Sequence, residues 1–522
     1  MLLSIRNYRK GLYSFLDPSN PSETKEYEEP IEQKWLPNDT IDPITKDVLH
    51  RNMQEHRNIT GIVDFVNRTR QGFSPRGIPL YMFHPLNKSY PPMIVSSKTQ
   101  YKINQLVSVN IEQWTEKWPR AGIQRLIGPV GNTNDEQAAI LQSMAIPPPK
   151  IEESAHSEPD TTHHTPFQGF VCHIDPDGCQ DVDDILLWNE QDGTIEFGIG
   201  IADVSAFLSE DSALDTYAKR LSQTVYMDGK PVYPMLPQTL SEQEASLRSD
   251  QRPRPVLTLF FTLQDGKVVK ERWEQNMTII QKTYTYESIY EDKPTAEKVK
   301  NYLEIVSGSP IGDDSHHWIE VAMVLYNSRA AKILKNQNVG IFRSQVEGRS
   351  QKEWADLAQS TGCKELAFFG YGSGKYVTAK EPDLRHTGMN LDLYCHVSSP
   401  LRRYVDLYNQ RWLKSILFHT VEPKQTLYVE HMNERNRLLK ISDRNLWFVQ
   451  NLATMTITNV QGFILKQKSD EYKIYVPVWK RTIKGKAGDT STFTIGQSVQ
   501  VRAFTDLRVP SLEDRIVCSF TT

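Results

Sequence analysis

The feature that most constrains this chain is a short acidic stretch. Five carboxylates fall within ten residues, at Asp175, Asp177, Asp181, Asp183 and Asp184. An unperturbed Asp has a pKa of about 3.9, so all five would be ionised at neutral pH and would repel one another. A divalent cation relieves such repulsion. Oxygen ligands without His or Cys at metal-binding spacing favour Mg²⁺, or Mn²⁺, over Zn²⁺.

The residues around this stretch predict a strand that leads into a turn. Phe170, Val171 and Ile174 supply the apolar positions of the strand, and Pro176 and Gly178 impose the turn. Two alternatives stay open, a solvated acidic loop and a Ca²⁺-binding loop. An EF-hand loop needs the spacing D-x-[DN]-x-[DN]-G with a closing Glu, and that spacing is absent here.

Length and composition indicate an ordinary multidomain protein. A chain of 522 residues divides into three or four domains at ~100–200 residues each. Hydrophobic residues make up 39% and charged residues 24%, and no apolar run approaches the ~18 residues of a membrane span. The five cysteines include no C-x-x-C pair, which favours a reducing compartment. We therefore expect a cytoplasmic protein, with a mitochondrial or nuclear location left open.

Within residues 51–146, the stretch from Arg57 to Lys102 carries an excess of positive charge, with Asp64 as its single acid, although the whole chain has a net charge of −4. Aromatic residues are interleaved with these cations, as in proteins that bind single-stranded nucleic acids. Short alternating stretches with Gly and Pro predict a small β-barrel of the cold-shock or OB type. Alternatively, the aromatic rings fill the barrel core. A helix is expected at residues 134–145, capped by Asn134 or Asp135. The rings belong to Phe65, Phe73, Tyr81, Phe83, Tyr90 and Tyr101.

The middle of the chain predicts a mixed sheet that follows a linker. Residues 1–50 are interpreted as an N-terminal extension, and residues 147–166, rich in Pro and acids, as the linker. Asp203 lies inside an apolar stretch and should have a partner. A long amphipathic helix is expected at residues 318–335. The linker histidines, interpreted as solvated, are His156, His163 and His164, and the strand-like stretches are residues 194–208, 224–227 and 256–263.

The C-terminal region, residues 452–522, predicts a second OB-type barrel. Four short strands surround a basic turn, which we expect to face a phosphate backbone. The strands are residues 461–465, 472–477, 498–502 and 515–520, and the turn carries Lys480, Arg481, Lys484 and Lys486.

A second polar motif, at residues 386–408, is not explained by ordinary packing. The sequence Ser398-Ser-Pro400 predicts a helix start, and Arg402 and Arg403 follow it directly. Serine hydroxyls, free N–H groups and two guanidiniums would together bind a phosphate. An alternative is a surface ion pair between Arg402 and Asp406. An acidic metal site combined with a basic phosphate site indicates phosphodiester hydrolysis.

Four ordered motifs within residues 167–451 resemble those of the ribonuclease II/R (RNB) family. The resemblance implies an α+β multidomain chain, with a mixed-sheet RNB catalytic domain at residues 167–451 flanked by OB-fold or cold-shock-type β-barrels. It also implies a Mg²⁺-dependent 3′→5′ exoribonuclease that threads single-stranded RNA and releases nucleoside 5′-monophosphates. The motifs are I-D-P-x(4)-D-x-D-D at 174–184, I-A-D-V-S at 201–205, P-M-L-P-x-x-L-S at 234–241 and H-x-G-x-x-L-x-x-Y-x-H-x-x-S-P-L-R-R-Y at 386–404.

The resemblance also implies roles for individual residues. Arg402 would assist phosphodiester cleavage beside catalytic Asp183, and Asp443 stands where relatives carry a downstream glutamate. Tyr226 would stack on the terminal bases, with Phe342 as its candidate partner. The implied metal ligands are Asp175, Asp181, Asp183 and Asp184, whereas Asp177 falls where no ligand is expected. The basic residues expected to contact RNA are Arg403, Lys480 and Arg481.

Two other classes of protein would share these features. One is a catalytically weak RNA-binding or assembly subunit that retains the fold. The complete aspartate set and Arg402 argue against it, because loss of activity usually removes a ligand first. The other is an endonuclease or phosphodiesterase that acts on other nucleic acids with the same metal chemistry.

Overall fold

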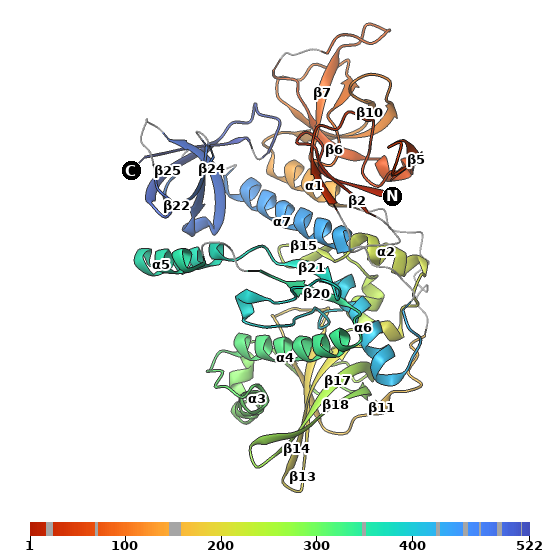
Figure 1. Cartoon of the computed structure of the whole chain (residues 1–522), viewed down its shortest axis with the longest axis vertical. Coiled ribbons are helices and arrows are strands. Elements are labelled where there is room, and N and C mark those ends of the chain that lie inside the picture. Colours follow the sequence, from red (N-terminus) through yellow and green to blue (C-terminus); the bar gives the residue numbers. More distant parts are fainter. Residues whose placement is uncertain are drawn as a thin grey trace. The chain divides into compact units, whose positions relative to one another are not determined.

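The computed structural model of this chain divides it into two compact units. It describes residues 1–16, 25–67, 71–145, 158–346, 351–423, 429–452, 458–468, 471–487, 493–512 and 514–521. The first unit combines residues 1–145, 349–370 and 434–522, and the second combines residues 146–348 and 371–433. Segments far apart in the sequence therefore share a unit, and the chain enters the second unit twice (Figure 1).

The first unit begins with a five-stranded sheet in the order β3-β2-β1-β4-β5. Leu3, Ile5 and Ile41 point into one core with Trp35. The segment expected as an N-terminal extension therefore folds into a sheet of its own. Its strands are β1 (Leu2–Asn7), β2 (Leu12–Leu16), β3 (Lys25–Glu28), β4 (Thr40–Ile41) and β5 (Val48–His50).

A closed barrel of strands β10-β8-β7-β6-β9 follows, which confirms the first predicted barrel. Phe65, Tyr81 and Phe83 are buried in its core, so these three rings fill the barrel and have no free face for a base. Helix α1 (Thr133–Met144) packs beside the barrel. The strands are β6 (Ile59–Val63), β7 (Leu80–Pro85), β8 (Met93–Ser96), β9 (Gln105–Gln113) and β10 (Arg120–Pro129).

The cap of α1 corrects the sequence prediction. Asn132 has an extended backbone, and its side chain accepts a hydrogen bond from the N–H of Asp135. This is the geometry of an N-cap residue. The expected caps, Asn134 and Asp135, lie instead within the first turn of the helix.

Strands β22-β23-β24-β26-β25 close a second barrel, as predicted. The expected basic turn is wrong for most of its residues, because Arg481, Lys484 and Lys486 lie on strand β24. Lys480 precedes this strand with a positive φ of 50°. Helix α5 (Gln351–Thr361) packs against this barrel. The strands are β22 (Thr458–Lys468), β23 (Glu471–Val476), β24 (Arg481–Ala487), β25 (Ser498–Thr505) and β26 (Ile516–Thr521).

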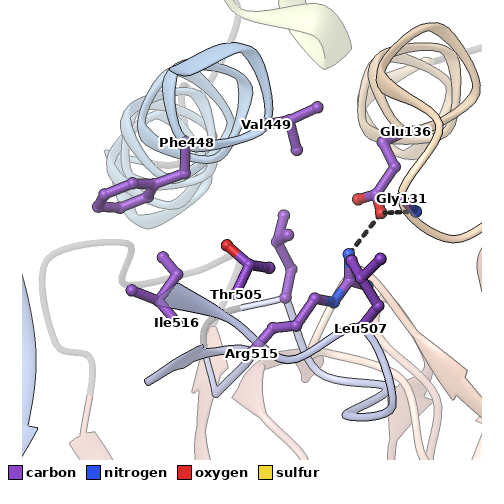
Figure 2. A pocket seen from close by; sticks show the side chains of 9 residues that line it. Gly131, Glu136, Phe448, Val449, Thr505, Leu507, Arg515 and Ile516 are labelled. Atoms are coloured by element: carbon purple, nitrogen blue, oxygen red, sulfur yellow. Dashed lines mark hydrogen bonds and ion pairs between the residues drawn. The ribbon is translucent and has the colours of Figure 1, made fainter. Parts of the chain in front are cut away.

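A small cavity in the first unit lies between α1, the C-terminal barrel and helix α7 (Val429–Leu452) (Figure 2). Phe448 and Val449 of α7 supply apolar lining. Glu136 on α1 and Arg515 form a buried ion pair at its edge. Glu136 also accepts a hydrogen bond from the N–H of Gly131 at 2.8 Å. This ion pair ties the loop before β26 to the helix of the first barrel.

The second unit is built on a seven-stranded sheet, β11-β18-β17-β14-β13-β12-β19. β11 runs parallel to β18 and β12 parallel to β19, while the other neighbours are antiparallel, so the predicted mixed sheet is confirmed. Asp192 and Gly193 both have positive φ, as a tight hairpin turn requires. The strands are β11 (Thr165–Pro166), β12 (Phe170–Ile174), β13 (Asp184–Gln191), β14 (Thr194–Ala202), β17 (Arg254–Gln264), β18 (Lys267–Thr278) and β19 (Lys282–Tyr284).

Helices bury apolar side chains in the same core as this sheet. Leu303 and Ala322 share one cluster with Ile199 and Leu259 of the central strands. The predicted helix at residues 318–335 lies within α4. No helix in the described ranges is long and apolar enough to cross a membrane. The remaining elements are α2 (Ala213–Leu221), α3 (Lys293–Ser307), α4 (Ser315–Asn336), α6 (Tyr404–Phe418), and the strand pairs β15 (Val225–Met227) with β16 (Lys230–Tyr233) and β20 (Ile341–Ser344) with β21 (Lys375–Thr378).

Candidate active site

Asp183 and Arg402 are in contact in the second unit, although they lie 219 positions apart in the sequence. Asp183 directly precedes β13, and Arg402 lies just before α6. Oδ2 of Asp183 accepts a hydrogen bond from Nε of Arg402 at 2.9 Å, and Oδ1 accepts one from the N–H of Leu401 at 3.0 Å. The Asp183 carboxylate is buried, whereas the Arg402 side chain is 47% exposed. Arg402 can therefore hold Asp183 and still present guanidinium surface to a ligand.

Burial raises the pKa of Asp183 to about 7, against the opposing effects of Arg402 and the Leu401 N–H. Burial also raises the pKa of Asp184, and the negative charges of Asp175 and Asp183 raise it further. The carboxylates are therefore close enough to disfavour ionisation of one another. Their crowding is only partly relieved by one guanidinium.

The donor chemistry of this cluster fits a hard divalent cation. Asp175, Asp181, Asp183 and Asp184 offer oxygen ligands only, and an added positive charge would favour their ionised forms. Across the parts of the chain that the structure describes, no three His, Cys, Asp or Glu side chains are already arranged to hold a metal ion. Asp177 is exposed in the turn beside Gly178, whose φ is 76°.

His173 holds Asp175 from the neighbouring strands. Nδ1 of His173 lies 2.9 Å from Oδ2 of Asp175, and its Nε2 lies 2.9 Å from Oγ1 of Thr283. The ring is buried on β12 beside β19. This side chain was not singled out from the sequence. Its position could have indicated the contact, because His173 lies two residues before Asp175 and residues two apart in a strand face the same side.

The Arg402 segment corrects two expectations from the sequence. Asp406 accepts hydrogen bonds from the Ser399 N–H and from Nη2 of Arg403, both at 2.8 Å. The alternative pair of Arg402 with Asp406 is therefore wrong, because the partner of Asp406 is Arg403. Oγ of buried Ser398 accepts a hydrogen bond from Asn327 at 3.1 Å. This serine faces the core, and α6 begins later, at Tyr404.

The two residues expected to stack on bases differ in their surroundings. The hydroxyl of Tyr226 on β15 donates a hydrogen bond to Oδ2 of Asp181, so this ring borders the acidic cluster. Phe342 is 0% exposed and belongs to the hydrophobic core of the second unit. The expected stacking role of Phe342 is contradicted, because its ring has no face left for a base.

Asp443, Lys480 and Arg481 belong to the first unit. Asp443 is largely exposed and accepts a hydrogen bond from Nη2 of Arg481 at 3.0 Å. The Arg481 guanidinium also lies 5.7 Å from the ring centroid of Trp447. A catalytic role for Asp443 and RNA contacts for Lys480 and Arg481 stay predictions.

Asp203 has hydrogen-bond and ion-pair partners, as we expected from its position in an apolar stretch of the sequence. Its Oδ2 accepts hydrogen bonds from Nζ of Lys414 at 2.6 Å and lies 3.0 Å from Nε2 of His164. Burial alone would raise the pKa of Asp203, but Lys414 and His164 hold it well below its ordinary value. The interpretation of His164 as solvated is wrong, since its side chain is 1% exposed. His163 is exposed, and His156 lies outside the described residues.

Comparison with known proteins identifies the second unit. The RNB domain matches residues 167–301 and 267–419. The chain belongs to the RNB domain family. The Dis3-like cold-shock domain 2 matches residues 80–145, within the first barrel region. RNB domains are found in 3′→5′ exoribonucleases, so the family identification agrees with the resemblance of the four motifs.

Relatives of this RNB chain are distant. Ribonuclease R of Helicobacter pylori is 26% identical over 325 residues, which cover 49% of each chain. The chain spans about half or less of the length of the first curated relatives it matches.

Two solved structures show the same fold. Ribonuclease R of Mycoplasma genitalium in complex with ribose-methylated single-stranded RNA has a TM-score of 0.73 at 16% identity, with both chains fully covered. Yeast Ssd1, a pseudonuclease, has a TM-score of 0.66 at 16% identity, over 88% of this chain and 69% of that one.

Proposed function

We propose that this chain is a Mg²⁺-dependent 3′→5′ exoribonuclease that degrades single-stranded RNA processively to nucleoside 5′-monophosphates. The observation that carries the proposal is the contact between buried Asp183 and Arg402 inside a partly buried acidic cluster of an RNB domain. Mn²⁺ is an alternative cofactor of the same ligand chemistry. RNA as the substrate is supported by the RNB family and by the cold-shock domain match.

Each part of the site has a chemical task in this proposal. Asp175, Asp181, Asp183 and Asp184 would hold the metal, which activates water and stabilises the leaving oxygen. Arg402 is fixed through its Nε, and its Nη2 lies 3.2 Å from Oγ of Ser399. The exposed part of this guanidinium can therefore stabilise the negative charge that develops on the scissile phosphate during cleavage.

Tyr226 and the barrels would bring the strand to this site. The Tyr226 hydroxyl is bound by Asp181, which fixes a ring next to the carboxylates for a terminal base to stack on. Asp443 keeps its proposed part as a downstream carboxylate, and Lys480 and Arg481 as contacts to the RNA backbone.

A second candidate function is RNA binding without cleavage. The fold shared with the pseudonuclease Ssd1 favours it, because this fold is compatible with loss of activity. The intact set of four aspartates and Arg402 favours the nuclease.

One experiment separates these functions. We expect 5′-labelled single-stranded RNA incubated with the protein and Mg²⁺ to shorten progressively from its 3′ end, with nucleoside 5′-monophosphates as the released products. Binding without shortening would support the RNA-binding function. Internal cuts would support an endonuclease and contradict the proposal.

A further inference from the structure

Arg343 is a guanidinium near Arg403 that has no counter-charge among the residues the structure describes. It lies on β20, directly after Phe342, and its side chain is half-buried. Among the residues that the structure describes, none accepts a hydrogen bond from this guanidinium or forms an ion pair with it, and its Nη1 is fully enclosed. The ring of Tyr376 lies beside the guanidinium, with its centroid 4.9 Å from Cζ.

The neighbouring arginines differ from Arg343 in this respect. Arg402 is paired with Asp183, and Arg403 is paired with Asp406. Arg402 and Arg403 thus have a carboxylate each, whereas Arg343 has none within the described part of the chain. Burial lowers the pKa of Arg343, and the positive charge of Arg403 lowers it further. Partly burying a cation without a partner is costly, so an anion is the missing component.

Two histidines close to Arg343 are kept neutral by burial and by the nearby arginines, which lower their pKa values. Nδ1 of His386 is buried and has no partner among the described residues. Burial holds the pKa of His396 well below its ordinary value, and Arg403, Arg343, His386 and Arg402 all act in the same direction. His396 therefore lies near the guanidiniums of Arg403, Arg343 and Arg402. Its Nδ1 lies 2.9 Å from the hydroxyl of Tyr376, so the imidazole is held in place.

The geometry around Arg343 is built to hold the guanidinium edge in one position. Arg343 and Tyr376 face each other across the β20–β21 pair, which fixes the stacked ring. A Cβ added at Gly374 would lie 3.1 Å from Nη2 and 3.2 Å from Nε of Arg343. The glycine therefore leaves the room that this edge occupies.

We infer that Arg343, with Arg403 and His386 beside it, binds one backbone phosphate of the RNA strand upstream of the phosphate that is cleaved. The inference rests on the proposed function, because that function supplies the polyanion. Arg402 serves the scissile phosphate, and Arg403 directly follows it in the chain. The positive charge of Arg343, which no described carboxylate compensates, matches the single negative charge of one internucleotide phosphate.

A methylphosphonate scan tests this inference. Single-stranded RNAs that each carry one neutral methylphosphonate linkage are titrated, in EDTA, against the wild-type chain, Arg343→Gln, Arg343→Lys and the control Arg329→Gln. Arg329 is an arginine of the same unit that is paired with Glu271 at 2.8 Å. We expect Arg343→Gln to weaken binding of unmodified RNA about tenfold, as loss of a charge-assisted hydrogen bond does. We expect Arg343→Lys to weaken it less and Arg329→Gln to leave it unchanged.

The scan itself gives the sharper result. Neutralising one particular upstream linkage should weaken RNA binding by the wild-type chain but should not weaken binding by Arg343→Gln any further. At the other sensitive linkages, neutralisation should weaken binding by both proteins. Because no carboxylate loses a partner, the thermal unfolding midpoint of Arg343→Gln should equal or exceed that of the wild type. Equal linkage profiles in both proteins, or a loss of stability together with affinity, would overturn the inference. If either of these results is found while the wild-type chain still binds and shortens RNA, the inference about Arg343 fails and the proposed function stands.

Discussion

Nε of Arg402 donates a hydrogen bond to Oδ2 of Asp183 at 2.9 Å and so joins the phosphate-binding side of the site to the acidic side. Arg402→Lys keeps the charge but loses the planar guanidinium that holds Asp183 while facing the substrate. We expect cleavage of single-stranded RNA to fall by about 100- to 1,000-fold, as for loss of one transition-state donor. Single-turnover rates and Kd values measure this, and an unchanged cleavage rate would contradict the role given to Arg402.

His173 should set the affinity for the metal. Removing a group that orients a metal ligand typically costs about 10–100-fold in metal affinity. We therefore expect His173→Ala to weaken Mn²⁺ binding in that range, and His173→Asn, which can still donate to Asp175, to weaken it less. Electron paramagnetic resonance of free Mn²⁺, without RNA, reports this directly. The control is His317→Ala, an exposed histidine paired with Glu320, and equal binding by all variants would refute the positioning role.

The Asp203–Lys414 pair should dominate the acid sensitivity of the second unit. The folded pKa of Asp203 is depressed, so its stabilising effect is complete above about pH 4, the ordinary Asp value. It is lost as the pH falls below that value toward the folded pKa. Lys414→Met removes the cation from the buried Asp203 carboxylate and leaves it only the His164 contact and the Ser205 hydroxyl, which should cost about 3–5 kcal/mol. In Asp203→Asn, unfolding free energy should vary less with pH below 4 than in the wild type, as measured by urea titration at several pH values.

Glu136 and Arg515 should stabilise the first unit in the same way. Their ion pair is buried, so Arg515→Met leaves the Glu136 carboxylate without its partner and should cost about 3–5 kcal/mol. The control is Arg508→Met, because Arg508 pairs with Asp506 at the surface and is 76% exposed. That change should stay within about 1 kcal/mol. Similar denaturation midpoints for the two variants would contradict the role assigned to the buried pair.

Local features of the fold followed from the sequence. The apolar run before Asp175, with Pro176 and Gly178 after it, is a strand and a turn because neighbouring residues decide both. Asp203 could be recognised as needing a partner from its apolar surroundings. Its partner Lys414 could not be identified, because it lies 211 residues away and only the packing of α6 brings it near.

The predictions from the sequence were wrong where the residue pattern of a short strand does not show which of its faces is buried. Phe342 and Arg343 are adjacent on a four-residue strand, and alternation puts one inward without saying which. Tertiary packing buried the phenylalanine and left the arginine beside the site. Likewise, Arg402 and Arg403 are equivalent in sequence, and only the fold assigns Asp183 to one and Asp406 to the other.

The most direct test of the central claim is the Mg²⁺-dependent rate of 3′ shortening of single-stranded RNA by Asp183→Asn, measured beside its RNA affinity. The carboxylate charge is lost in this variant, while Tyr226 and the basic surfaces remain. The account predicts that cleavage is abolished and that the Kd for RNA stays within a few-fold of the wild-type value. Full cleavage by Asp183→Asn would contradict it.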